Sequence, residues 1–155
     1  MPRGSAQRGF TYVWVLALIA TLGAALSVAG PRWADEARRE QERELLRVGM
    51  LYARAIRSYH DVSPGSLKQH PPSLDALLQD KRLVGTYRHL RKLYGDPMAA
   101  AHGWGLVLGE DGSIRGVYSR SSGAPLRSEA LDLGLVKLPA ARNYSEWKFI
   151  PEIPS

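Results

Sequence analysis

The chain contains no cysteine, which excludes disulfide bonds, a thiol nucleophile and a thiolate metal site. Its four histidines lack the paired spacing of a metalloprotease helix. Neither a nucleophile elbow nor a phosphate-binding P-loop is present. The sequence therefore offers no recognisable catalytic constellation, and we expect a protein that is not an enzyme.

A strong excess of one charge is also missing. The chain has 155 residues with 21 Lys or Arg and 15 Asp or Glu, which gives a formal net charge of +6. So small an excess suits a solvated surface of mixed sign, whereas a nucleic-acid-binding protein concentrates its basic residues on one face. We therefore expect no nucleic-acid partner. At this length the chain has room for one domain besides a short anchor.

Long apolar runs are absent except near the N-terminus. No charged residue lies between Arg8 and Arg32, and the apolar run over residues 10–30 is 21 residues long. As a helix it spans about 31 Å, close to the ~30 Å apolar core of a bilayer. The run is longer than the core of a secretory signal, and Pro31 directly after it disfavours cleavage there. The sequence predicts a transmembrane helix over residues 10–30 and a soluble body over residues 31–155.

The start of this run resembles the processing site of a known family. Arg8-Gly9-Phe10-Thr11, between a basic leader and an apolar helix, is similar to the site in type IV pilins and type II secretion pseudopilins. In that family a prepilin peptidase cuts after the glycine, on the cytoplasmic side, and methylates the new N-terminal residue. The resemblance implies a leader over residues 1–9, cleavage between Gly9 and Phe10, and N-methylation of Phe10.

The resemblance also implies that Thr11, Trp14 and Pro31 take part in assembly. Pro31 lies where these proteins often have a proline that kinks the helix. Trp14 occupies the fifth mature position, where the family usually has a glutamate that neutralises the buried N-terminal ammonium of a neighbouring subunit. A subunit without this carboxylate suits a minor role or the tip of a filament. Tyr12 and Trp14 are also typical of an interfacial aromatic belt.

Localisation and partners follow from the same resemblance. It implies a single-pass inner-membrane protein with a periplasmic C-terminal body. Its partners would be the membrane, the prepilin peptidase, other pseudopilin subunits and inner-membrane proteins of the secretion system. Counting basic residues on either side of the helix favours the opposite orientation. Arginines precede the helix at Arg3 and Arg8 and follow it at Arg32, Arg38, Arg39, Arg43 and Arg47.

Beyond Pro31 the pattern predicts a continuing helix. The charged residues 34–44 indicate a solvated segment stabilised by pairs three and four residues apart. An apolar stripe at helical spacing follows: Leu45, Val48, Tyr52, Ile56 and Tyr59. If Pro31 only kinks the chain, one helix runs from about Thr11 to His60. Gly49, between stripe positions, is expected to allow a close approach to the helix backbone.

The connector between helix and sheet is rich in cations. Residues 73–78 predict a second helix with Ser73 as its N-cap. Six basic side chains follow: Lys81, Arg82, Arg88, His89, Arg91 and Lys92. Such a run is usually a solvated surface. The alternative is a docking face for a partner protein or anionic lipid, in a signal-anchored membrane protein that is not processed.

The last third of the chain predicts a small antiparallel sheet. Runs over residues 104–108 and 114–119 flank Asp111-Gly112 and indicate a hairpin, and a late strand over residues 145–150 follows. Asp96-Pro97 predicts a structural corner. The order of these elements resembles the body of major-type pseudopilins. The expected fold class is α+β, with a long transmembrane-plus-amphipathic helix packed on the sheet in the lollipop arrangement of pilins.

Calcium is the one ligand that the resemblance raises. Some major-type pseudopilins bind calcium in their C-terminal loop. Glu129 and Asp132 are the acidic residues of the corresponding stretch. They are too few for a shell of about six to eight oxygens unless carbonyls and waters supply the rest. We therefore expect no cofactor, with calcium at Glu129 and Asp132 as the alternative.

Overall fold

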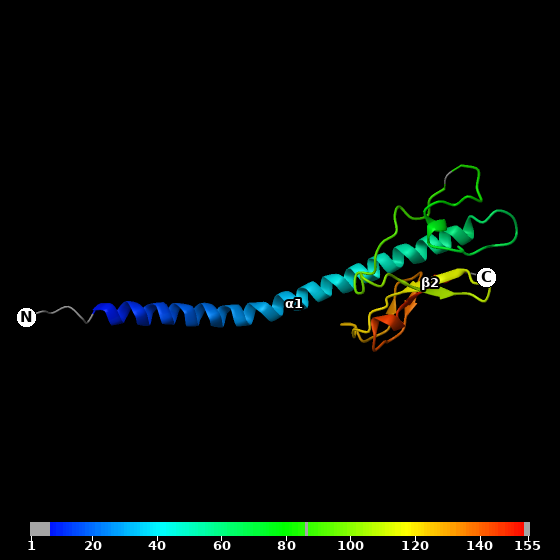
Figure 1. The fold of residues 1–155 in the computed structure, drawn as a ribbon. Coiled ribbons are helices and arrows are strands. Elements are labelled where there is room, and N and C mark those ends of the chain that lie inside the picture. The colour runs from blue at the N-terminus through cyan, green and yellow to red at the C-terminus, as the bar shows by residue number, and fades with distance from the viewer. Residues whose placement is uncertain (1–6, 86, 154–155) are drawn as a thin grey trace, which may run out of the picture. The chain divides into compact units, whose positions relative to one another are not determined.

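A computed structural model of the chain describes residues 7–85 and 87–153; the side chains of residues 7–9 and 25–32 lie outside this description. The chain forms two compact units, Met1–Arg39 and Glu40–Ser155, which we call unit 1 and unit 2. The fold class is α+β, as predicted (Figure 1). In chain order the elements are α1 (Gln7–Asp61), the 3₁₀ turn η1 (Asp75–Leu77), β1 (Gly105–Leu108), β2 (Ile114–Tyr118), β3 (Leu131–Asp132), β4 (Lys137–Leu138), the 3₁₀ turn η2 (Tyr144–Glu146) and β5 (Lys148–Phe149).

The predicted single helix is confirmed, because α1 includes Pro31 without interruption. Between residues 7 and 39, unit 1 consists of α1 alone, and the side chains over residues 10–24 are all exposed. Over the residues that the structure describes, no helix is long and apolar enough to cross a membrane. The side chains from residue 25 to the end of the expected 10–30 span lie outside the described residues.

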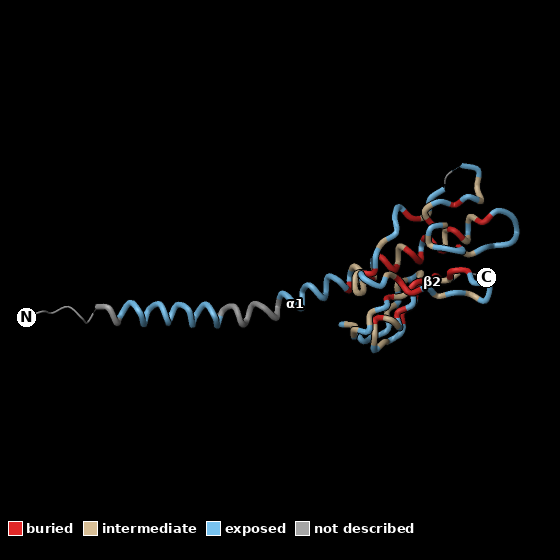
Figure 2. Tube along the Cα trace, viewed as in Figure 1, coloured by how far each residue is buried: buried red, intermediate tan, exposed pale blue. Residues whose placement is uncertain are grey.

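In unit 2 the apolar stripe of α1 forms one side of the core. All five stripe residues are buried, as the periodicity predicts: Leu45, Val48, Tyr52, Ile56 and Tyr59. Figure 2 shows the buried residues gathered on this part of α1 and on the strands. A Cβ atom added to Gly49 would lie 2.5 Å from ring carbons of Phe149. The expected close approach at Gly49 is therefore confirmed, and Phe149 is the residue that makes it.

The predicted hairpin and late strand form one antiparallel sheet in the order β1-β2-β5. Leu106 pairs with Val117, and Val117 pairs with Phe149, so these three side chains share one face. Gly112 closes the hairpin with φ of 75°, a left-handed conformation that glycine adopts without strain. Strands β3 and β4 form a separate antiparallel pair.

The predicted second helix forms only in part. Only the three-residue turn η1 forms, although the N–H of Ala76 still approaches Oγ of Ser73 at 3.4 Å. The carbonyl of Leu77 accepts hydrogen bonds from the N–H groups of both His89 and Leu90, each at 2.9 Å. An α-helix needs that carbonyl for the residue four positions later. The returning connector thus occupies the acceptor that a helix continuing to Lys81 would need.

Candidate functional site

The predicted processing and assembly residues lie on the first part of α1. Gly9 is helical, and its surroundings fall outside the described side chains. Phe10 and Trp14 are 68% and 65% exposed, and Thr11 is also exposed. Pro31 lies within the helix, with its side chain outside the description. The described structure therefore places Phe10, Thr11 and Trp14 on an open helix surface that no other segment of unit 1 covers.

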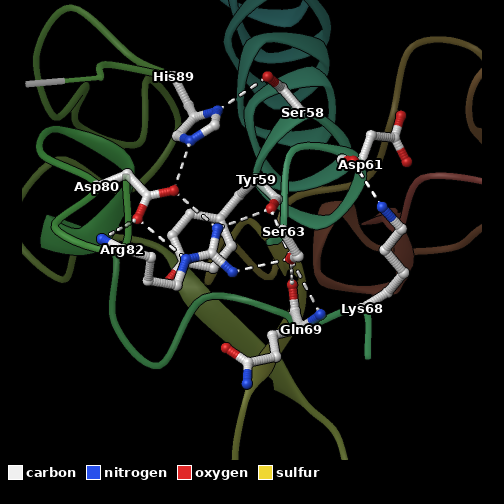
Figure 3. Close-up of polar contacts among 9 residues, drawn as sticks. All are labelled: Ser58, Tyr59, Asp61, Ser63, Lys68, Gln69, Asp80, Arg82 and His89. Carbon is white, nitrogen blue, oxygen red and sulfur yellow. Dashed lines mark hydrogen bonds and ion pairs between the residues drawn. The ribbon is translucent and has the colours of Figure 1, made fainter. Parts of the chain in front are cut away.

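Unit 2 contains a buried ionic cluster that the sequence analysis did not predict (Figure 3). At its centre is Asp80, whose side chain is 0% exposed. Its Oδ1 accepts from Nε of Arg82 at 2.9 Å, and its Oδ2 accepts from Nη2 of the same guanidinium at 2.7 Å. Nε2 of the fully buried His89 reaches Oδ2 at 3.2 Å. Because an ionised carboxylate only accepts, both neighbours donate to Asp80.

Arg82 joins three segments of the chain. Its Nη2 also donates to the carbonyl of Tyr59 at 2.8 Å, and its Nη1 donates to Oγ of Ser63 at 2.8 Å. The guanidinium stacks on the Tyr59 ring, with its carbon 3.5 Å from the ring centroid. The second ring nitrogen of His89, Nδ1, lies 2.8 Å from Oγ of Ser58 in α1. The end of α1, the loop after it and the connector are thereby held together.

The electrostatics of the cluster match this geometry. Hydrogen bonds from the Arg82 guanidinium hold the pKa of Asp80 well below its usual range. The same hydrogen bonds raise the pKa of Arg82 above its ordinary value. Burial raises the pKa of the neighbouring Tyr59 hydroxyl. A carboxylate held ionised and saturated with donors is a poor general base, so the cluster acts as a structural clamp.

A hollow of about 380 Å³ adjoins this clamp. Tyr59 and Arg82 form one wall, and residues of η1 and its flanks form the rest: Pro72, Ser73, Asp75, Ala76, Gln79 and Lys81. The lining carries charges of both signs, negative at Asp75 and positive at Lys81 and Arg82. The charge of Arg82 is paired with that of Asp80. This mixed lining selects neither an anionic nor a cationic ligand.

The structure corrects the interpretation of the cationic connector. Arg82 and His89, expected on a solvated surface, turn inward to Asp80. The other four basic side chains are exposed: Lys81, Arg88, Arg91 and Lys92. The sequence held one signal for this arrangement, since a lone aspartate opens a run of cations. What it could not reveal is the bridge between Asp80 and Tyr87, which folds the run back on itself.

A second buried carboxylate belongs to Glu42, within the segment predicted to be solvated. Its side chain is 5% exposed. Oε2 accepts from the backbone N–H of Leu126 at 2.7 Å and from the hydroxyl of Tyr144 at 2.8 Å. Nε of Arg127 lies 3.8 Å from Oε1. The prediction of a solvated segment is therefore wrong at Glu42, which fixes a loop and η2 to α1.

The Asp96-Pro97 corner is confirmed. Asp96 is buried, and its Oδ1 accepts from the N–H of Met98 at 2.9 Å. Oδ2 accepts from the hydroxyl of Ser119 at 2.7 Å and from the N–H of Arg120 at 3.1 Å. These contacts shape the turn and join it to the end of β2.

The two residues of the calcium alternative lie at the surface of unit 2. Glu129 and Asp132 are both exposed, and Oδ1 of Asp132 accepts the N–H of Gly134 at 2.8 Å. Among the described residues, no group of three or more acidic or histidine side chains is placed to hold a metal ion.

Two histidines lie close together in unit 2. The ring centroids of His60 and His70 are 4.9 Å apart. Burial, with Arg115 and His60 nearby, lowers the pKa of His70 to about 4.

Comparison of the chain with protein-family models, with curated proteins and with solved structures gives no match. Function is therefore inferred from the chain's own residues and from the geometry above.

Proposed function

We propose that this chain is a non-enzymatic pseudopilin-like structural subunit of a type II secretion or type IV pilus-related system. It is anchored in the inner membrane with its body in the periplasm, and it assembles through its N-terminal helix as a minor or tip subunit. One observation carries the proposal. Helix α1 begins at Gln7 and includes the Arg8-Gly9-Phe10 motif, bears exposed apolar side chains over residues 10–24, and bears a buried stripe from Leu45 to Tyr59.

The exposed part of α1 needs a partner outside the chain. Large apolar side chains there are 48% to 68% exposed: Phe10, Tyr12, Val13, Trp14, Val15, Leu16, Leu18, Ile19 and Leu22. Burying a fully exposed side chain of this kind contributes about 1.5–3 kcal/mol. Contiguous apolar surface of this extent is typical of membrane or protein contacts. Lipid and the helices of neighbouring subunits are the partners that a pseudopilin would supply.

The hydroxyl of Thr21 in this segment agrees with an apolar environment. Oγ1 of Thr21 donates within the helix, lying 2.8 Å from the carbonyl of Ala17 and 2.9 Å from that of Leu18. Its hydroxyl therefore needs no water. The backbone groups of an α-helix are likewise satisfied internally, which is the condition for a segment in lipid.

The second candidate function is an unprocessed, signal-anchored protein whose connector binds an anionic lipid surface. Four exposed cations favour it: Lys81, Arg88, Arg91 and Lys92. Val84, fully exposed between them, adds an apolar side chain of the kind that enters a membrane interface. This function requires no cut after Gly9, so the two candidates differ in the mature N-terminus.

The test is the mass of the N-terminus in cells that contain a prepilin peptidase. The proposal expects a mature chain that starts with methylated Phe10, and a Gly9→Val variant that keeps the leader because the added side chain obstructs the cut. Gly23→Val is the matched control, since a Cβ at Gly23 meets nothing within 4 Å. This control should be processed normally. A wild-type chain that keeps Met1 would overturn the proposal in favour of the second candidate.

A further inference from the structure

Strand β1 forms an open edge of the three-stranded sheet. It pairs with β2 on one side only. Among the described residues, no backbone hydrogen bond joins its other side to the rest of the chain. An open edge presents unpaired N–H and C=O groups that can accept another strand.

Two usual protections of an edge strand, a charged residue and a proline, are missing from β1, although its pairing with β2 is irregular between Val107 and Leu108. Over residues 105–109 the chain has neither a charged residue nor a proline. Leu106 and Leu108, on the face that β1 shares with the core, remain 38% and 57% exposed. The opposite edge strand differs, because β5 is only two residues long and carries the exposed Lys148. The sheet is therefore protected at one edge and open at the other.

The sequence of the open strand is symmetric about its centre: Gly105-Leu106-Val107-Leu108-Gly109. Two antiparallel copies related by a twofold axis at Val107 would pair Val107 with itself and Leu106 with Leu108 of the other copy. Because side chains alternate along a strand, both leucines of both copies would then lie on one face. No like charges oppose each other in this register, since Glu110 falls opposite Trp104.

We propose that β1 pairs with β1 of a second copy of this chain, joining two three-stranded sheets into one. A second copy fits this strand because twofold pairing opposes apolar residues to apolar residues without like charges, and an isologous contact uses the same patch on both subunits. The pairing would cover the exposed leucines and satisfy the open backbone groups. This contact uses unit 2 alone and is independent of the association through α1 proposed above.

The cysteine-free chain allows a direct test. In the full chain in mild detergent, Val107→Cys places one thiol of each copy at the twofold axis. Paired residues of an antiparallel ladder have Cα atoms about 4.5–5.5 Å apart, within the range of a disulfide. We expect Val107→Cys to form disulfide-linked dimers on the order of tenfold faster than the control Lys148→Cys on β5, because pairing raises the effective concentration. Equal rates would overturn the proposal.

Charge variants provide the second arm. Val107→Lys and Val107→Glu each place like charges on the axis, so each should shift the chain from dimer to monomer in analytical ultracentrifugation. Mixing the two variants should restore a dimer, because opposite charges then meet. Thermal unfolding of each variant checks that the sheet is intact. A dimer that persists in both single variants would come from α1 or another surface and would overturn pairing through β1.

Discussion

Two stretches of helix α1 differ in how far their side chains are buried. Over residues 10–24, α1 has apolar side chains that are all exposed within unit 1. Over residues 42–59, the helix buries an apolar stripe in unit 2 and adds the buried carboxylate of Glu42. The two glycines make the same contrast. A Cβ on Gly23 meets nothing within 4 Å, whereas one on Gly49 meets the Phe149 ring. Both stretches are helical, but only the second has a periodic apolar stripe that is covered by contacts within the chain.

The largest difference between the units should come from the buried cluster. Asp80→Asn removes the charge that balances Arg82 in a buried site, which should lower the free energy of unfolding of unit 2 by about 3 kcal/mol. Asp35→Asn, an exposed change in unit 1, should cost less than about 0.5 kcal/mol. Urea unfolding followed by near-UV circular dichroism measures the free energy of unfolding of both variants. Equal effects would show that the cluster does not stabilise unit 2.

The glycine pair should give the next largest difference. Gly49→Ala forces the Phe149 ring to shift and should destabilise unit 2 by about 1–3 kcal/mol, the usual range for overpacking. Gly23→Ala should instead favour the helix by up to about 1 kcal/mol, because alanine is the better helix former. Thermal unfolding followed by near-UV circular dichroism measures the effect of Gly49→Ala. Far-UV circular dichroism measures the helix content of the Gly23→Ala variant. If Gly49→Ala is neutral, Phe149 does not set the spacing between helix and sheet.

The last predicted difference concerns the dependence of stability on pH. The pKa of His70 falls from 6.5 to about 4 on folding. The unfolded chain therefore binds more protons between these values, and unit 2 should lose stability as the pH falls from 6.5 towards 4. Asp80, whose pKa is lowered from 3.8, should lose its contribution only below about that pH.

A variant isolates the histidine contribution. His70→Phe keeps an aromatic ring beside His60 but cannot titrate, so its free energy of unfolding should vary less between pH 6.5 and 4. An identical pH slope in wild type and His70→Phe would assign the acid sensitivity to another group.

Local patterns predicted much of the fold. The stripe from Leu45 to Tyr59 follows from helical spacing, and the hairpin at Asp111-Gly112 follows from turn chemistry and alternation. The end of the second helix was not predictable, because the N–H groups that occupy the Leu77 carbonyl come from His89 and Leu90. The residues of the predicted helix carry no information about N–H donors that come from a later part of the chain.

The candidate sites likewise differ in whether their residues are adjacent in the sequence. The motif at Gly9-Phe10 is contiguous in sequence, so it could be found there. The Asp80 cluster draws on Ser58, Ser63 and His89, whose approach depends on how two loops close. Glu42 resembles its charged neighbours on α1, and only the packing of Tyr144 and Leu126 distinguishes it.

Glu42 also constrains the order of events during synthesis. Its partners lie 84 and 102 residues further along the chain. A ribosome adds about 5–20 residues per second, so Glu42 exists for seconds before Tyr144 does. Until then its carboxylate must stay hydrated, and this part of α1 cannot close its core around it. The completed body of unit 2 is thus a post-synthetic event, and a nascent chain truncated before residue 144 should leave that face of the helix open to chaperones.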